Sequence, residues 1–193
     1  PKGFLYRRSL GQSPEETGRF VSGAVAAMHQ NGLGCVLKHF PGYGNNADTH
    51  TGIARDDRPL EALENADLVP FAAGIQAGCD AILVSHILVS ALDETAPASL
   101  SPAVHDYLRN TMGFDGVIVT DDLVMEAITQ VYGVGEAAVQ AVLAGNDLLC
   151  STEYPVQYAA VLEAVQRDQI PEDLINDAVL RILHWKQDLG FFN

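Results

Sequence analysis

Short apolar runs alternate with longer amphipathic segments along the chain. The apolar runs occupy residues 34–38, 81–84, 116–119 and 147–150. They contain few alternating polar positions, which is typical of strands buried on both faces of a sheet. The segments around them predict helices at residues 13–31, 59–77, 102–112, 123–128, 135–144, 155–167 and 171–189. This alternation predicts an α/β chain built of strand–helix units with a parallel sheet.

Local signals define several of the helix ends. Ser13, Pro14 and Glu16 supply an N-cap, a first-turn proline and a capping-box glutamate for the first helix, and Gly32 stops it. Pro70 is a candidate break within the segment 59–77. The last helix carries apolar residues at helical spacing and is therefore expected to be amphipathic.

Polar residues follow every predicted strand directly. They are Lys38–His39, Ser85–His86, Thr120–Asp121–Asp122 and Ser151–Thr152, in chain order. In a (β/α) barrel the carboxyl ends of the strands form the active-site face. Four such coincidences indicate an enzyme site.

The number of strands constrains the architecture. A closed eight-stranded barrel takes about 250 residues, whereas this chain of 193 residues shows four strands, or five if Phe4–Arg8 contributes one. An open, doubly wound sheet is the alternative. We expect about half of a barrel, with the other half missing.

Composition and charge narrow the class of partner. Apolar residues make up 48% and charged residues 19% of the chain, as in a well-packed globular protein. The net charge of -14 argues against nucleic acid or an anionic membrane as a partner. No apolar run approaches the ~18 residues of a membrane span and no signal peptide is visible, so a cytoplasmic location is slightly favoured over secretion, although the compartment stays open. The cysteines show no metal-binding or redox spacing and are expected to be buried, reduced thiols: Cys35, Cys79 and Cys150.

Asp121 ends the third predicted strand, where its backbone is rigid and its side chain can enter the mouth of a barrel. A carboxylate held in this way suits a nucleophile. Its neighbour Asp122 points to the other side and is expected to cap the following helix.

The Gly- and Asn-rich loop after the first strand carries Asp48 and His50. In an extended segment both side chains point to one side, and the carboxylate would raise the pKa of the imidazole. His50 is thus a candidate general acid with Asp48 as its orienting partner, while a metal site and a plain polar loop remain alternatives.

Lys38 and His39 are suited to bind hydroxyl or carbonyl groups of a substrate, and His86 could line the same site. The helical residues His29, His105 and His184 are expected to have no special role. A metal-dependent hydrolase is a rival interpretation, with imidazole and carboxylate ligands drawn from His39, His50, His86, Asp48 and Asp121.

Three stretches of the sequence resemble family 3 glycoside hydrolases, specifically the β-N-acetylglucosaminidase (β-N-acetylhexosaminidase) branch. They are "KHFPGYG" with the nearby "DTH", "GVIVTDDLVMEAI" around Asp121, and "RRSLGQSPEE" upstream. Their order and spacing match that family. Tyr43 stands where many relatives have histidine, a departure expected to affect loop packing more than chemistry.

The resemblance implies a single domain, residues 1–193, forming the C-terminal portion, about half, of a (β/α)8 TIM-type barrel. It implies retaining hydrolysis of terminal β-linked N-acetylglucosamine through a covalent glycosyl-aspartate intermediate, with no cofactor. Asp121 would be the nucleophile and His50 the acid/base with Asp48 as its partner. The N-acetylated sugar would be bound by Arg8, Lys38 and His39, with Met125 near the nucleophile; because Arg7 is adjacent, the arginine assignment could shift by one.

Two consequences of the resemblance concern completeness and substrate. The expected substrate is a glycan or muropeptide containing N-acetylglucosamine, which suggests cell-wall recycling. The chain is expected to need the missing N-terminal half of the barrel, or an oligomer, to fold and act. A non-catalytic carbohydrate-binding fragment is therefore a further alternative.

Overall fold

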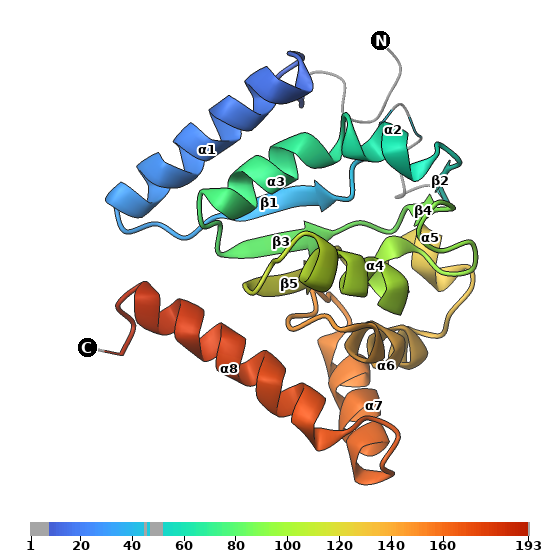
Figure 1. Ribbon diagram of the computed structural model, residues 1–193. Helices are drawn as coiled ribbons and strands as arrows, with labels where there is room; N and C mark the ends of the chain where they lie inside the picture. Colours follow the sequence, from blue (N-terminus) through green and yellow to red (C-terminus); the bar gives the residue numbers. More distant parts are fainter. Residues whose placement is uncertain (1–7, 45, 47–51, 193) are drawn as a thin grey trace.

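The computed structural model describes residues 8–44, 46 and 52–192. Its central sheet contains three parallel strands, β1 (Val36–Phe40), β3 (Ala81–Val84) and β5 (Val117–Thr120), in the order β1-β3-β5 (Figure 1). The strand order therefore follows the chain order, without the reversal that marks a doubly wound sheet. Helices pack on the outside of the sheet, as predicted for strand–helix units.

The predicted strand at residues 147–150 is reduced to a bridge. Leu148 pairs in parallel with Val119, with its N–H donating to the Ile118 carbonyl at 3.1 Å and its carbonyl accepting from Thr120 at 3.1 Å. The chain thus occupies the fourth position of the sheet without forming a regular strand there. Both edges of the sheet are open in the described part of the chain, since neither β1 nor the bridge at Leu148 has a further strand beside it there.

The inner strands β3 and β5 are buried except for one partly buried residue each, which explains their continuous apolar sequences. Ala81, Ile82 and Val117 have no exposed surface and belong to the inner strands. Ile82 packs against apolar side chains from the surrounding helices, in a cluster that includes Val25, Leu63 and Leu108. Burial on both faces is the environment that favours unbroken apolar runs over alternating ones.

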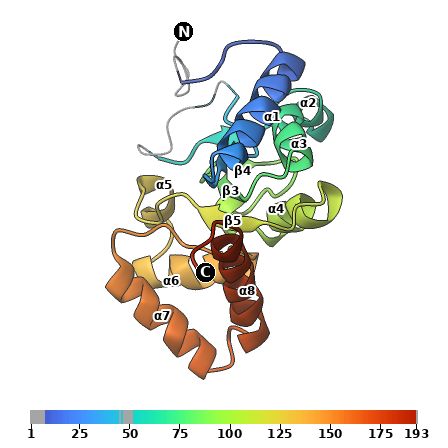
Figure 2. The same cartoon turned by 90° about the vertical axis from the view of Figure 1, so that its left-hand side faces the viewer.

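The first helix, α1 (Pro14–Gln30), begins at the predicted capping box. The Ser13 hydroxyl accepts a hydrogen bond from the Glu16 N–H at 3.2 Å, and the Glu16 carboxylate accepts from the Ser13 N–H at 3.4 Å. α1 packs against α3 (Leu68–Gln76) on the outer face of β1 (Figures 1 and 2).

The predicted break at Pro70 is wrong in position. The segment 59–77 forms α2 (Leu60–Glu64) and α3 (Leu68–Gln76), and the break lies at residues 65–67. Pro70 falls in the first turn of α3, where a missing N–H costs little because the residue four positions earlier, Ala66, lies outside the helix.

Of the later helices, those predicted at residues 135–144, 155–167 and 171–189 match the structure to within one residue at each end, whereas the helix predicted at 123–128 begins only at Glu126. The segment 102–112 forms α4 (Pro102–Asp106), capped by Ser101, followed by a π-helical turn at Tyr107–Thr111. The remaining helices are α5 (Glu126–Thr129), α6 (Val134–Ala144), α7 (Tyr154–Gln166) and α8 (Glu172–Asp188). No residue of α8 is buried. Among the described helices, none is long and apolar enough to cross a bilayer.

A second, two-stranded sheet was not predicted from the sequence. β2 (Arg55–Asp56) and β4 (Leu88–Val89) pair in parallel in the loops that follow β1 and β3. Two-residue strands leave no readable periodicity. They nevertheless tie these two loops together at the carboxyl end of the central sheet.

The cysteine prediction holds for two of three residues. Cys35 and Cys79 are buried and free, and burial raises the pKa of Cys35 to about 11 and that of Cys79 to about 12. Cys150 is exposed, contrary to the prediction, because the chain at the fourth sheet position lies at an open edge.

Candidate active site

The carboxyl ends of the three strands are held together by backbone hydrogen bonds. The Ser85 N–H donates to the Phe40 carbonyl at 2.9 Å, and the Asp121 N–H donates to the Val84 carbonyl at 3.0 Å. The polar residues after β1, β3 and β5 therefore lie at one edge of the sheet. This is the arrangement that the sequence analysis expected.

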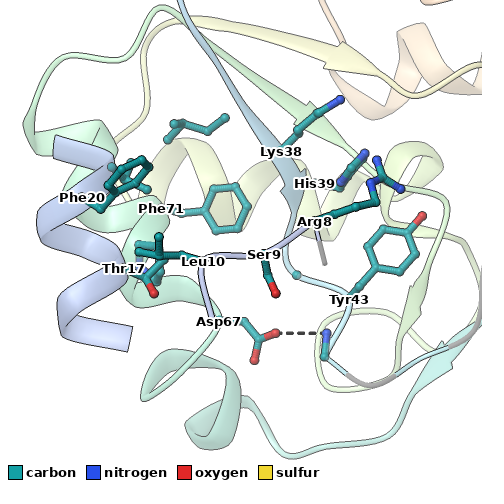
Figure 3. A pocket seen from close by; sticks show the side chains of 15 residues that line it. Arg8, Ser9, Leu10, Thr17, Phe20, Lys38, His39, Tyr43, Asp67 and Phe71 are labelled. Carbon is teal, nitrogen blue, oxygen red and sulfur yellow. Dashed lines mark hydrogen bonds between the residues drawn. The ribbon is translucent and has the colours of Figure 1, made fainter. Parts of the chain in front are cut away.

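A pocket of about 660 Å3 opens beside the end of β1 (Figure 3). Arg8, Lys38 and His39, three of the predicted sugar ligands, all line it. One side of the pocket carries Arg8, Lys38, His39 and Tyr43, and the other carries apolar residues of α1 and α3 such as Phe20 and Phe71. The pocket thus combines hydrogen-bond donors with an apolar wall, as small-ligand sites do.

His39 and Lys38 differ in exposure although they are adjacent. His39 is 9% exposed and meets Tyr43 edge-to-face, with ring centroids 5.5 Å apart. Lys38 is exposed, so its ammonium can reach a ligand in the pocket. Tyr43 is 1% exposed and also lines the pocket. The Lys38–His39 and Phe40–Pro41 peptide bonds are both cis.

The loop after β1 is anchored by an ionic cluster. Arg58 donates from Nη1 to Asp67 at 2.7 Å and from Nη2 to Asp56 at 2.6 Å. Asp67 in turn accepts from the Gly44 N–H at 3.2 Å (Figure 3). Burial alone would raise the pKa of Asp56, but the hydrogen bonds from Arg58 outweigh it and hold the pKa below its usual value.

Gly42 is required by this anchor. Its φ of 120° is rarely adopted by other residues, and a Cβ added there would lie 2.6 Å from the Cβ of Asp67. The loop therefore passes closely over Asp67 only because position 42 has no side chain.

Asp48 and His50, the predicted acid/base pair, lie outside the described residues, as does Arg7. The assignment of His50 as the general acid stays a prediction. On either side of this segment the described chain is fixed at the site, by Gly44 on Asp67 and by Asp56 in β2.

Asp121 is partly buried at the end of β5, and its Oδ1 accepts from the Asp122 N–H at 2.9 Å. Asp122 does not cap a helix as expected; its Oδ1 accepts from the Val124 N–H at 3.2 Å in a turn before α5, whose N-cap is Met125. Met125 is 7% exposed. Of these described residues, neither Asp121 nor Met125 lines the pocket beside β1.

His86 lies beneath the site rather than in it. It has no exposed surface, and its ring nitrogens contact the Ser99 hydroxyl at 2.7 Å and the Asp122 carbonyl at 2.9 Å. An imidazole with Nε2–H donating to the carbonyl and Nδ1 accepting from Ser99 satisfies both contacts. His86 thereby holds the turn next to Asp121, a role that its sequence position alone did not reveal.

Comparisons with known proteins agree with this geometry. Residues 2–185 match the model of the glycosyl hydrolase family 3 N terminal domain. A beta-hexosaminidase of Xanthomonas oryzae pv. oryzae is 40% identical over 163 residues, covering 82% of this chain and 48% of the relative. A beta-hexosaminidase of Xylella fastidiosa is 42% identical over 150 residues, covering 76% of this chain and 44% of the relative. The chain thus spans about half the length of the curated relatives it matches.

Solved structures show the same relationship. A family 3 β-N-acetylglucosaminidase from Paenibacillus sp. superposes with a TM-score of 0.90 at 40% identity, over 95% of this chain and 36% of that one. A β-N-acetylhexosaminidase from Beutenbergia cavernae gives a TM-score of 0.85 at 33% identity, over 93% of this chain and 55% of that one. The described fold is therefore part of larger proteins of this kind.

Proposed function

The chain belongs to glycoside hydrolase family 3, and from that premise we propose that it forms part of a retaining β-N-acetylhexosaminidase. One observation carries the proposal: the sheet brings Asp121 to the same edge as a pocket lined by Arg8, Lys38 and His39. A carboxylate and several hydrogen-bond donors at one edge match the needs of glycoside hydrolysis.

The proposed architecture is a single domain, residues 1–193, that supplies the C-terminal half of a (β/α)8 barrel. The strand order follows the chain order, both sheet edges are open in the described chain, and the match covers about half of each curated relative. An open parallel edge exposes unpaired backbone groups and invites pairing. We infer that further strands, from the remainder of a barrel or from another copy, complete the sheet.

In the proposed mechanism Asp121 attacks the anomeric carbon while His50 protonates the departing glycosidic oxygen, with Asp48 orienting the imidazole. The resulting glycosyl–aspartate ester is hydrolysed by water, and His50 then accepts the proton of that water. Two inversions at the anomeric carbon retain its configuration. The rigid position of Asp121 at a strand end supports the nucleophile role, because attack requires the carboxylate to be placed within ~3 Å of the carbon.

Arg8, Lys38 and His39 would hold the N-acetylated sugar. Arginine and lysine donate charge-assisted hydrogen bonds to hydroxyl and carbonyl oxygens, and the apolar wall at Phe20 and Phe71 suits the less polar face of a ligand. The substrate class is a glycan with a terminal β-linked N-acetylglucosamine, with cell-wall fragments as natural candidates.

The rival metal-dependent interpretation is not favoured by any contact in the described site. Of its candidate ligands His39, His50, His86, Asp48 and Asp121, His86 is the least suited, because both of its ring nitrogens already have partners in Ser99 and Asp122. A metal ligand offers one nitrogen lone pair to the ion.

The test is the variant Asp121→Asn in a polypeptide that completes the barrel. Because the amide cannot form the covalent intermediate, we expect turnover of an aryl N-acetyl-β-glucosaminide to fall by at least about 10³-fold. Asp115→Asn is the matched control, since Asp115 is exposed near the opposite end of β5; it should keep wild-type turnover. Undiminished turnover in Asp121→Asn, with both variants folded by circular dichroism, would reject the assignment.

A further inference from the structure

Three metal-binding residue types meet at the amino end of the sheet, away from the proposed active site. The Nε2 atom of His29 lies 3.0 Å from Oδ2 of Asp80 and 3.9 Å from Sγ of Cys35. The potential ligand atoms of the three residues all lie within 4.8 Å of one another. Sequence spacing did not reveal this cluster because Cys35 and Asp80 are 45 positions apart.

Each residue of this cluster comes from a different part of the fold. His29 is in the last turn of α1, Cys35 directly precedes β1, and Asp80 directly precedes β3. The Cys35 N–H donates to Oδ2 of Asp80 at 2.7 Å and so fixes that carboxylate relative to the thiol. Such a supporting hydrogen bond to a carboxylate is the feature that orients ligands in metal sites.

The distances suit a tetrahedral ion. Zn²⁺ bonds of about 2.0–2.3 Å place nitrogen, oxygen and sulfur donors about 3.3–3.6 Å apart. The two separations, 3.0 and 3.9 Å, lie on either side of that range. Coordination of one ion by all three atoms therefore requires adjustment of these side chains.

The cluster is also open to cations from solvent. The side chains of His29 and Asp80 are 36% and 14% exposed, while Cys35 is buried behind them. Asp80 lines a pocket of about 240 Å3 together with Asp115 and Asp188, and with Arg181 and His184. Arg181 is paired with Asp147, so the three carboxylates, on a chain of net charge -14, favour cations at this opening.

We propose that His29, Cys35 and Asp80 bind one divalent cation of the Zn²⁺ type, with water as the fourth ligand. Thiolate, imidazole and carboxylate together are the donor set that zinc accepts. On binding, the Cys35 thiol loses its proton to solvent and the sulfur–metal bond takes its place. The ion ties α1 to the starts of β1 and β3, which makes the site structural and independent of the proposed hydrolase chemistry.

The competing interpretation is an ion pair of His29 with Asp80 that needs no metal. Titration with Co²⁺ and then Zn²⁺ distinguishes this ion pair from the proposed metal site. Titrating the full chain with Co²⁺ should give one equivalent of a cobalt–thiolate charge-transfer band, which Zn²⁺ then removes. Cys35→Ser should abolish the band and weaken Zn²⁺ binding by at least about 10-fold in calorimetry. Cys150→Ser, which removes the exposed thiol, should leave both unchanged.

His29→Ala is a second test that does not depend on whether the Cys35 variant folds. His29 is at an exposed helix end, so its replacement is expected to leave the fold intact. It should lower Zn²⁺ affinity by a similar factor while circular dichroism stays unchanged. Absence of the charge-transfer band in the wild-type chain would overturn the proposal. So would a band that persists in Cys35→Ser or disappears in Cys150→Ser.

Discussion

The two ends of the central sheet use charge in opposite ways. At the amino end the side chain of Asp147 is 2% exposed and accepts from Arg109 at 2.6 Å, Arg181 at 2.9 Å and the Ile118 N–H at 2.7 Å. Arg109 also donates to the carbonyls of Phe114 and Gly116 at 2.8 and 2.6 Å. At the carboxyl end, Lys38 is exposed on the wall of a pocket.

This difference indicates where the fold is stabilised and where a ligand is bound. A buried carboxylate must be compensated by several donors, or its desolvation would destabilise the fold. A charge that binds a ligand must instead stay accessible until the ligand arrives. The amino end is therefore expected to govern stability and the carboxyl end to govern activity, the division known for parallel (β/α) sheets.

The largest expected effect on stability is that of the substitution Arg109→Met. Removing one partner leaves the Asp147 carboxylate buried without its closest cation, so we expect the free energy of unfolding to fall by about 3–5 kcal/mol in urea denaturation. Arg167→Met is the matched control, because Arg167 pairs with Glu163 at an exposed site where loss costs under about 0.5 kcal/mol. An Arg109 variant as stable as the control would remove the basis of the comparison.

Lys38→Met tests the other end of the sheet. Loss of a charge-assisted hydrogen bond of about 1.5–3 kcal/mol predicts that kcat/KM on an N-acetyl-β-glucosaminide falls by roughly 10–100-fold in the complete barrel. The free energy of unfolding should change by less than about 0.5 kcal/mol, since Lys38 is exposed. Lys186→Met on the exposed surface of α8 is the control for charge removal. The opposite pattern, lower stability with intact kcat/KM, would contradict the division between the two ends.

The variants of His86 are expected to have a smaller effect. His86 is a buried residue at the carboxyl end of the sheet, where it contacts the turn beside Asp121. His86→Gln places an amide near the position of Nε2 and can keep the bond to the Asp122 carbonyl, whereas His86→Asn reaches only the position of Nδ1 beside Ser99. We expect His86→Asn to lower kcat about 10-fold relative to His86→Gln, with similar KM, because displacing the turn beside Asp121 affects the reacting geometry. Equal kcat values in the two variants would show that His86 only fills space.

The strand–helix alternation, most of the helix limits and the meeting of Lys38, His39 and Asp121 at one sheet edge could be predicted from the sequence. Each depends on local patterning or on the rule that parallel strands end at the same edge. Family resemblance added Arg8, which lines the pocket; its role as a sugar ligand remains a prediction. The roles assigned to Asp48 and His50 remain predictions.

The missed features depend on tertiary contacts that no local pattern encodes. Pro70 was a misleading signal, because a proline is tolerated in the first turn of a helix. The break in the segment lies before α3, at residues 65–67. The β2–β4 pair is too short to show periodicity. His86 was expected to line the site, and no role was predicted for the Asp147 side chain; only the fold shows which backbone groups and cations they meet.

The smallest expected effect refines the comparison, because the carboxyl end also contains one paired cluster, Asp56 with Arg58. Hydrogen bonds from Arg58 hold the pKa of Asp56 below its usual value despite burial. A lowered pKa in the folded state means that Asp56 contributes stability above the unfolded pKa of about 3.9, and that this stability is lost as pH falls through the folded pKa. The free energy of unfolding should therefore fall less between pH 7 and about pH 3 in Asp56→Asn than in the wild-type chain. Urea titrations at each pH measure this difference. An unchanged acid dependence would mean that the loop anchor contributes no stability through this charge, and that the amino end alone carries the ionic stabilisation of the sheet.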